Sequence, residues 1–356
     1  MNSRLASIVR LSNERKLVVA ITVVSLAVLS EGPEAVALTV FGVGFKTHAE
    51  AVGLPSELYR FSETGPMEQR WDIPESYYGL SLATDGASLF VGEFAGAIER
   101  YNFHGGYLGE FADVSGLAGA NARGQNLETD AAGSIYVNFG GQSSLPRTSF
   151  RLDASGSVAQ SFSHPELVFP RGIDAAANGD VYILNNAGAG VGNRIFRFSA
   201  NGAHVDDFAI PEVDNPSDIA INEANGELYV ADGSGNAVHV YDISFGMPAY
   251  LDTLALPGHG SDVFVEPRSG RIFGSYFTVE NKPVLHVRDV GFEVSRDGAL
   301  VTHFVEDAPS QFQTVAGLVA VVPEPARAVL VTIAAGLTWL RRRFAHALRR
   351  ARGGAP

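Results

Sequence analysis

Four oxygen-bearing side chains recur near the starts of four repeated segments, and they are the first candidates for chemistry in this sequence. They are Asn126, Asp174, Asp218 and Asp262. Carboxylate and amide oxygens are the ligands that Ca²⁺ prefers, so a fold that brings these groups together predicts a calcium site. Similar polar groups follow the next hydrophobic run of each repeat, at Glu93, Asn138, Asn185 and Asp232. The alternative is structural, because Asp and Asn also cap turns and bond their own backbone, and no ligand spacing here is diagnostic of a metal.

Other catalytic patterns are missing from the sequence. There is no cysteine, which excludes disulfides, thiolate metal sites and a cysteine nucleophile. The nine histidines show no metal-ligand spacing, and no Gly-x-Ser-x-Gly nucleophile elbow occurs. The glycine-rich run 188–192 connects two expected strands and does not precede a helix, so it does not predict a phosphate site.

The elements that must position these side chains form an internal repeat. Each unit has a hydrophobic run, a small or polar turn and a second run with a central aromatic residue. The units are 77–111, 122–162, 170–208, 216–254 and 260–304. The aromatic residue recurs at Phe90, Tyr136, Tyr182, Tyr229 and Phe273. The period of 44 to 47 residues predicts one supersecondary unit per repeat.

Each repeat continues with a third strand and a hairpin. The run from Phe196 to Gly202 matches the run from Phe150 to Gly156, and each hairpin ends on a phenylalanine. The turn glycine supplies the positive φ that a tight hairpin needs. Four short strands per repeat at this period predict the blade of a β-propeller, an all-β fold.

The two ends of the repeat region complete one another. Residues 59–71 read as a third and fourth strand without a first, and residues 315–321 read as a first strand with nothing after it. We expect these segments to join in one blade, with residues 38–46 as its second strand. The sequence therefore predicts six blades, the last of them shared by N- and C-terminal strands, in a ring without exposed inner edges.

The blade pattern resembles the NHL repeat family of propellers. The match is clearest over 215–221, 228–232 and 236–241. The resemblance implies the fold, and it implies little about function. Proteins of related architecture include lactonases and a peptide-amidating lyase with central metals. The resemblance thus leaves a metal-dependent hydrolase or lyase as the alternative to a non-enzymatic binding or scaffold module.

The charge distribution excludes one class of partner. The chain carries −13 overall, but residues 38–322 hold 15 basic and 35 acidic residues, a net charge of −20. Binding to phosphates requires basic patches, so nucleic acid is excluded as a partner.

The N-terminus has the organisation of a secretory signal. Four basic residues precede the uncharged apolar run 17–29, which is too short to span a membrane comfortably. Small residues follow at Ala35 and Ala37, which predicts cleavage by signal peptidase before Leu38. An uncleaved signal anchor is the alternative.

The C-terminus has three parts in a fixed order. Pro323, Glu324 and Pro325 come first, an apolar segment over 326–340 follows, and Arg341, Arg342 and Arg343 follow that segment. The arginines are expected to stay cytoplasmic by the positive-inside rule while the body has crossed the membrane. A plain tail anchor is the alternative, but a stop-transfer helix is normally nearer twenty residues.

This order resembles the PEP-CTERM sorting signal of Gram-negative envelope proteins. The resemblance implies transient residence in the inner membrane and processing by exosortase, a membrane-embedded cysteine peptidase. Arg327, early in the apolar segment, and the long tail after the arginines depart from the pattern. The expected organisation is a signal peptide at 1–37, a propeller at 38–321 and a sorting signal at 322–356. We expect an exported protein of the envelope, outer surface or medium that binds extracellular polysaccharide, a peptide or a protein.

Overall fold

The computed structural model describes the repeat region of the chain. The described residues are 38–46, 56–73, 79–93, 96–117, 123–130, 132–140, 147–186, 192–244, 248–267, 269–281, 285–304 and 313–321. All of them belong to one compact unit, Leu38–Glu324. Two groups of predicted residues lie outside the described part: Ala35 and Ala37 of the signal, and Pro323, Glu324, Pro325, Arg341, Arg342 and Arg343 of the sorting motif. The described residues include no helix long and apolar enough to cross a membrane.

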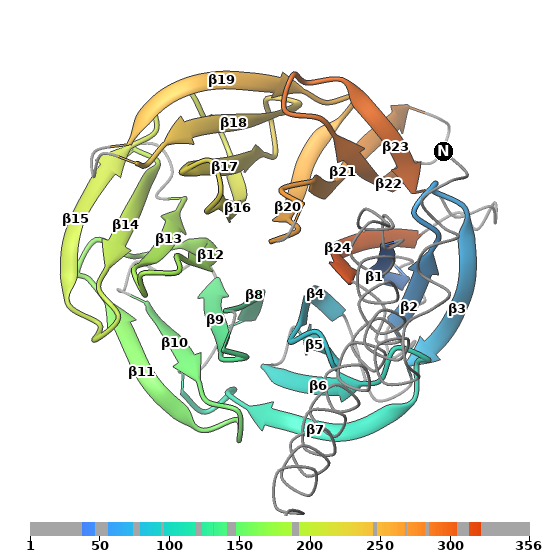
Figure 1. Cartoon of the computed structure of the whole chain (residues 1–356), viewed down its shortest axis with the longest axis horizontal. Helices are drawn as coiled ribbons and strands as arrows, with labels where there is room; N and C mark the ends of the chain where they lie inside the picture. Colours follow the sequence, from blue (N-terminus) through green and yellow to red (C-terminus); the bar gives the residue numbers. More distant parts are fainter. Residues whose placement is uncertain are drawn as a thin grey trace, which may run out of the picture. The chain divides into compact units, whose positions relative to one another are not determined.

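The described strands form six four-stranded antiparallel sheets arranged around a common centre (Figure 1). In chain order they are β1 (Thr39–Lys46), β2 (Ser56–Phe61), β3 (Met67–Ile73), β4 (Gly79–Thr84), β5 (Leu89–Glu93), β6 (Ala97–Tyr101), β7 (Tyr107–Asp113), β8 (Arg123–Thr129), β9 (Ile135–Gly140), β10 (Thr148–Leu152), β11 (Val158–Ser163), β12 (Pro170–Ala175), β13 (Val181–Asn185), β14 (Arg194–Phe198), β15 (His204–Ala209), β16 (Pro216–Asn222), β17 (Glu227–Asp232), β18 (Ala237–Asp242), β19 (Ala249–Ala255), β20 (His259–Val265), β21 (Ile272–Asn281), β22 (Leu285–Val294), β23 (Leu300–Phe304) and β24 (Gln313–Val321). The prediction of a six-bladed propeller is confirmed. We number the blades 1 to 5 from β4–β7 to β20–β23, and call the sheet β24-β1-β2-β3 the closing blade.

The closing blade joins the two ends of the ring. β1 pairs with β24 from Thr39↔Val321 to Lys46↔Gln313, and on its other side β1 pairs with β2. The N-terminal strand is therefore the second strand of this blade and the C-terminal strand is its first, as predicted. Because Thr39 and Val321 are register partners, the chain enters and leaves the ring at neighbouring points.

The recurring aromatic residues fill the space between blades. Tyr136 of β9 is 2% exposed and packs in one cluster with Ile173, Val181 and Phe196 of the next blade. Tyr229 and Phe273, at the same position in blades 4 and 5, have no exposed surface. This repeated burial of an aromatic side chain stabilises the contact between neighbouring blades.

The outer hairpins follow one local design. Gly202 lies at φ 81° in the β14–β15 turn and donates its N–H to the carbonyl of Ser199. In every blade the fourth strand then carries a β-bulge next to the turn, such as Val205 in β15 and Leu251 in β19. A bulge twists an edge strand away from regular pairing, and it therefore protects the outer edge of each blade from adding a further strand.

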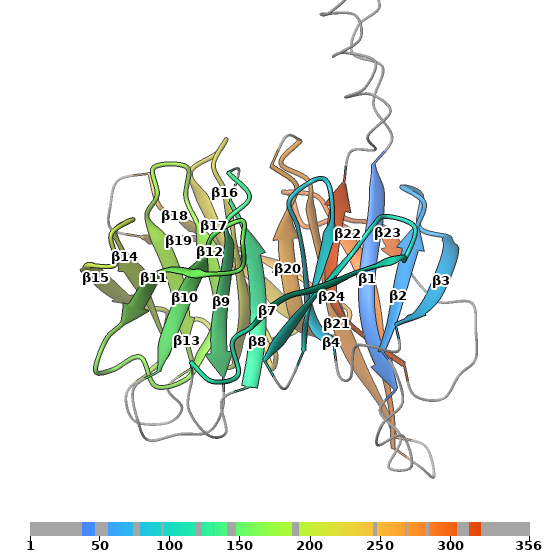
Figure 2. The same cartoon turned by 90° about the horizontal axis from the view of Figure 1, so that it is seen from below.

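The ring has two unlike faces. On the turn face the first strand of blades 1 to 5 joins the second, and in all six blades the third strand joins the fourth. On the loop face the second strand joins the third and each blade joins the next. The β21–β22 hairpin has ten residues in each strand and extends past the other strands on the loop face (Figure 2). Thr39 and Val321 lie at the turn face, because they occupy the junction between the first and second strands of the closing blade.

Candidate functional site

Asn126 and Asp218, two of the four predicted ligands, bind each other near the ring centre. The Nδ2 group of Asn126 in β8 donates to Oδ1 of Asp218 in β16, which is two blades away. The second oxygen of Asp218 accepts the N–H of Val263 in blade 5, at 3.0 Å. Both side chains are buried, with Asp218 only 3% exposed. These bonds link blades 2, 4 and 5 through one carboxylate.

Gly172 makes the link across blade 3 possible. A Cβ atom placed on Gly172 in β12 would lie 2.8 Å from Oδ1 of Asp218 and 2.5 Å from the backbone nitrogen of Ile219. The missing side chain leaves room both for the carboxylate and for close approach of β12 to β16. The glycine at this repeat position is required by interblade geometry.

Asp174 does not lie at the level of the other three predicted ligands. It pairs with Tyr182, whereas Asn126 pairs with Asn138, two residues beyond the equivalent Tyr136. The residue equivalent to Asp174 is therefore Glu128, which pairs with Tyr136. The predicted group separates into two levels: Asn126, Asp218 and Asp262 lie toward the loop face, and Asp174 lies with Glu128 toward the turn face. Aligning the repeats on their aromatic residue would have found Glu128 in the sequence.

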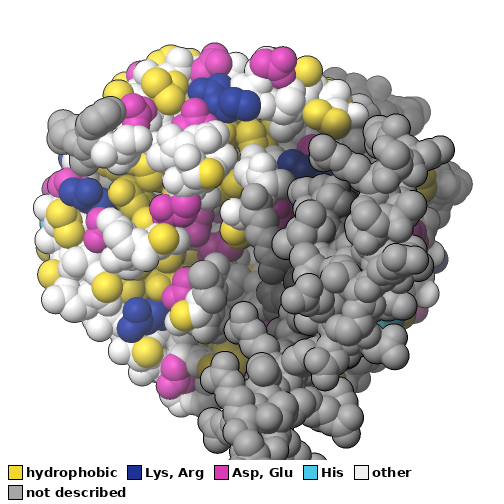
Figure 3. Space-filling model, in the orientation of Figure 1, with side chains coloured by type: hydrophobic (Ala, Val, Ile, Leu, Met, Phe, Trp, Pro, Cys, Tyr) yellow, Lys and Arg dark blue, Asp and Glu magenta, His cyan; other side chains and the backbone are white. Residues whose placement is uncertain are grey.

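The carboxylates at these two levels repel one another. Burial raises the pKa of Asp218 well above its ordinary value, and the charge and hydrogen bond of Asp262 raise it further. Burial and the charges of Asp174 and Asp262 likewise raise the pKa of Glu128. Burial raises the pKa of Asp174 to about 7, although two backbone N–H groups partly offset the effect. Figure 3, which views the turn face, shows acidic side chains near the centre of the ring.

The two carboxylate oxygens of Asp174 accept hydrogen bonds from backbone N–H groups of blades 3 and 4. Its Oδ2 accepts the N–H of Ile221 in blade 4, and its Oδ1 accepts the N–H of Ala175, each at 2.6 Å. Asp174 thus connects blade 3 to blade 4, as Asp218 connects blade 4 to blade 5.

Among the residues that the structure describes, no group of three or more His, Asp or Glu side chains has an arrangement able to hold a metal ion.

The polar residues at the ends of second strands fasten the connections between blades. Asn185 accepts the N–H groups of Val168 and Phe169 and donates to the carbonyl of Glu166. Asp232 has the same place in the next blade, and it accepts the N–H groups of Asp214, Asn215 and Ser234 at 2.9–3.1 Å. At positions 185 and 232, bonding to nearby backbone groups therefore accounts for the presence of Asn and Asp.

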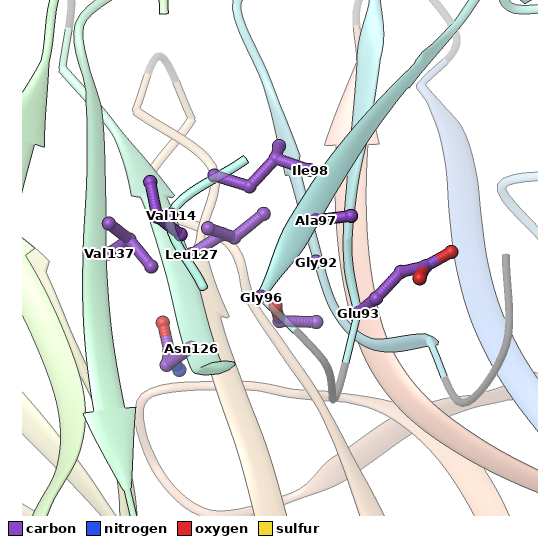
Figure 4. A pocket seen from close by; sticks show the side chains of 10 residues that line it. Gly92, Glu93, Gly96, Ala97, Ile98, Val114, Asn126, Leu127 and Val137 are labelled. Carbon is purple, nitrogen blue, oxygen red and sulfur yellow. The ribbon is translucent and has the colours of Figure 1, made fainter. Parts of the chain in front are cut away.

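A small pocket lies between blades 1 and 2 (Figure 4). Its lining includes Gly92 and Ile98 of blade 1 with Leu127 and Val137 of blade 2, and the polar residues Asn126 and Glu93 also belong to the lining. Its volume of about 10 Å³ is near the lower limit for one water molecule, so this pocket cannot hold a substrate.

Asn138 is a fully buried amide in the second strand of blade 2. It has no exposed surface, and among the described residues neither its Nδ2 nor its Oδ1 finds a hydrogen-bond partner; the same is true of the Ser149 hydroxyl. Phe150 pairs with Val137, which places Ser149 opposite Asn138 at the next step of the sheet. The repeat-equivalent residues in blades 1, 3, 4 and 5 are Gly92, Leu184, Ala231 and Ser275. The amide is therefore particular to blade 2 and is not demanded by the fold.

Replacing Asn138 with leucine, the residue of blade 3, is expected to raise the free energy of unfolding by about 1–2 kcal/mol. The change removes a buried amide whose desolvation is not repaid by hydrogen bonds. Urea denaturation measures the difference. Asn185→Leu is the matched control, because Asn185 is equally buried but fully bonded, and this variant should lose stability. A loss in Asn138→Leu comparable with that control would show that the Asn138 amide is bonded in solution.

The comparisons with known proteins agree with this architecture. A family model described as the NHL repeat matches residues 214–241, the segment that contains Asp218 and Asp232. The propeller body therefore carries an NHL repeat. No curated protein matches the sequence significantly.

Solved structures with the same fold are distant in sequence. A protein of unknown function from Bacteroides caccae matches with a TM-score of 0.57 at 13% identity, covering 80% of this chain and 99% of that one. A chain of the nidogen/laminin complex matches at 0.58 and 13%, covering 79% and 98%. A protein of Bacteroides fragilis, provisionally assigned as a 6-phosphogluconolactonase, matches at 0.51 and 12%, covering 82% and 100%. At these identities the likenesses establish the fold alone.

Proposed function

We propose that this protein is an exported envelope or extracellular-matrix protein whose propeller is a non-enzymatic binding or scaffold module. The observation that carries the proposal is the use of the central polar groups. Asn126, Asp174 and Asp218 bond one another or the backbone of the next blade. Groups engaged in holding blades together are poorly placed to polarise a substrate, because catalysis needs polar groups directed at the reacting atoms.

The loop face is the surface that we assign to the partner, which is an extracellular polysaccharide, a peptide or a protein. Both ends of the ring are at the turn face, where Thr39 pairs with Val321. A tether attached through either end therefore holds the ring by the turn face and leaves the loop face for binding. The extended β21–β22 hairpin adds surface on that side.

The terminal segments supply the route to this location. The proposed route is export through the signal at 1–37, cleavage after Ala37, a transient inner-membrane stage through 326–340, and exosortase processing near Pro323–Pro325. The order of the three C-terminal parts supports this route, as does the concentration of positive charge at the two ends of an otherwise acidic chain.

A metal-dependent hydrolase or lyase is the second candidate, and one observation favours it. The charge of Asp262 raises the pKa values of Asp218 and Glu128, the charge of Asp174 also raises that of Glu128, and a bound cation would relieve this repulsion. Of the four ligands expected from the sequence, Asn126, Asp218 and Asp262 share one level of the ring and would hold Ca²⁺, which would act as a Lewis acid on a substrate oxygen, whereas Asp174 lies at the other level.

One experiment tests both candidates. The protein is recovered from the membrane, medium and matrix fractions of its native host, and its intact mass is measured in native mass spectrometry with and without added calcium. The expected result is a chain that begins at Leu38, lacks the segment after the Pro-Glu-Pro motif, holds no calcium and is retained with matrix material.

The other outcomes are decisive in different ways. Retention of residues 326–356 in the mature protein would overturn exosortase processing. A calcium adduct that is lost in Asp262→Asn but kept in Asp252→Asn, a change at an exposed carboxylate of β19, would overturn the non-enzymatic assignment in favour of the metal site.

A further inference from the structure

A charged cluster spans the seam where the ring closes. Arg271, immediately before β21 of blade 5, donates from Nε and Nη2 to the two oxygens of Glu293, each at 2.7 Å. Its Nη1 group donates to Oε1 of Glu63, in the β2–β3 turn of the closing blade. One guanidinium thus joins blade 5 to the closing blade through two carboxylates.

The backbone nitrogen of Leu38 completes the contacts of Glu63. Leu38 immediately precedes β1 and is buried, with 7% of its surface exposed. Its N–H donates to Oε2 of Glu63 at 3.3 Å, so the two oxygens of this carboxylate contact Arg271 and the start of the closing blade.

The nature of this nitrogen depends on processing. In the precursor it is a peptide N–H, which is neutral and offers one donor. Cleavage before Leu38 hydrolyses the peptide bond: the hydroxyl of water joins the Ala37 carbonyl, and the nitrogen of Leu38 gains the proton. Near neutral pH it gains a second proton and becomes an ammonium group with three donors.

We infer that Glu63 binds the α-ammonium group of the mature chain, so that removal of the signal peptide strengthens closure of the ring. The inference rests on the proposed cleavage before Leu38. Charge balance supports it, because Glu63 and Glu293 carry two negative charges and Arg271 carries one positive charge. An ammonium group at Leu38 neutralises the remaining charge, and Leu38 already holds its nitrogen within hydrogen-bond distance of the carboxylate.

Six chains test the inference. Three begin at Leu38 and three at Ala37; all run to Pro356 in the same non-ionic detergent, and each start is made with the natural sequence, with Glu63→Gln and with Glu68→Gln. At pH 7 the Leu38 start is expected to melt about 2 °C higher than the Ala37 start when Glu63 is present. The difference should vanish with Glu63→Gln. Glu68→Gln, which alters an exposed ion pair of the adjacent strand, is the control and should preserve the difference.

The pH dependence gives a second readout. Binding by a carboxylate raises the pKa of the α-amino group above its ordinary value of about 8, so the extra stability is complete below pH 8 and is lost as the pH rises through the raised value. Selective acetylation of the Leu38 amine, followed by mass spectrometry across pH, measures that pKa. A melting difference that is the same with Glu63 and with Glu63→Gln, or an ordinary pKa, would overturn the inference. N-terminal sequencing of the native protein separates this failure from a failure of the proposed cleavage site, because the recombinant chains fix the start independently.

Discussion

Replacing Gly172 with alanine is expected to lower the free energy of unfolding by about 3 kcal/mol. The added methyl group would lie 2.5 Å from the nitrogen of Ile219 and 2.9 Å from the carbonyl carbon of Asp218. These are backbone atoms of β16, so rotation of a side chain cannot relieve the contact. Blades 3 and 4 must separate, and the interblade packing around Ile173 and Ile219 must loosen with them.

Urea denaturation of the Gly172→Ala variant measures this loss. Gly116→Ala is the matched control, because a Cβ at Gly116 meets no atom within 4 Å and the position has no positive φ. That change should be neutral or slightly stabilising, since alanine restricts the unfolded chain. Equal stability of the two variants would contradict the close approach of β12 to β16.

The Gly172 variant also tests the hydrogen bond between blades 2 and 4. Its methyl group would lie 2.8 Å from Oδ1 of Asp218, the atom that accepts the Asn126 amide. Asn126→Ala removes that bond without a steric clash. We therefore expect the glycine variant to lose more stability than Asn126→Ala, and the difference between them reports the contribution of backbone approach.

The fold was predictable because its determinants are local and repeated. The aromatic residue from Phe90 to Phe273 recurs once per blade, and turn glycines such as Gly156 and Gly202 stand where a positive φ is needed. The partial repeats at the two ends of the chain each lack strands, but together they supply the four strands of one complete blade. Since closing the ring buries an otherwise exposed inner edge, the pairing of 39–46 with 313–321 followed from them.

The central site was less predictable because it depends on register and distance. Asp174 looked equivalent to Asp218, but Asp174 pairs with the aromatic residue Tyr182, whereas Asp218 pairs with Ala231, two residues beyond the aromatic Tyr229. The partner of Asn126 lies 92 residues away and is reached only because the intervening blade has a glycine. The sequence also could not predict that the Asn138 amide is buried, because the residues at the equivalent position of other blades are as different as Gly92 and Leu184.

The polar residues that end second strands illustrate a third case, in which the residue type is informative but ambiguous. Asn and Asp at 185 and 232 fit both a cation site and backbone capping. The structure distinguishes the two roles through the donors, which are backbone N–H groups of the segment connecting one blade to the next. The oxygens of Asn185 and Asp232 that accept these N–H groups already have partners on the loop face.

Replacing Asp232 with alanine is expected to lower the free energy of unfolding by about 3 kcal/mol. The carboxylate is 1% exposed, and its removal leaves the N–H groups of Asp214, Asn215 and Ser234 without their acceptor. The connection from blade 3 to blade 4 would then lose its attachment to β17. Asp232→Asn should lose less, because Asn185 performs the same role with an amide in blade 3.

The pH dependence of unfolding separates the charge of Asp232 from its hydrogen bonds. Burial would raise the pKa of Asp232, but the neighbouring His239 and hydrogen bonds from the backbone of Ser234 and Asp214 hold it well below its ordinary value. A carboxylate with a lowered pKa contributes stability that is present above the unfolded value of about 3.9 and is lost as the pH falls through the folded value. Wild-type protein should therefore lose stability between about pH 5 and pH 2 more steeply than Asp232→Asn. Parallel curves for the two proteins would mean that the negative charge of Asp232, including its 3.5 Å contact with His239, contributes nothing measurable to stability.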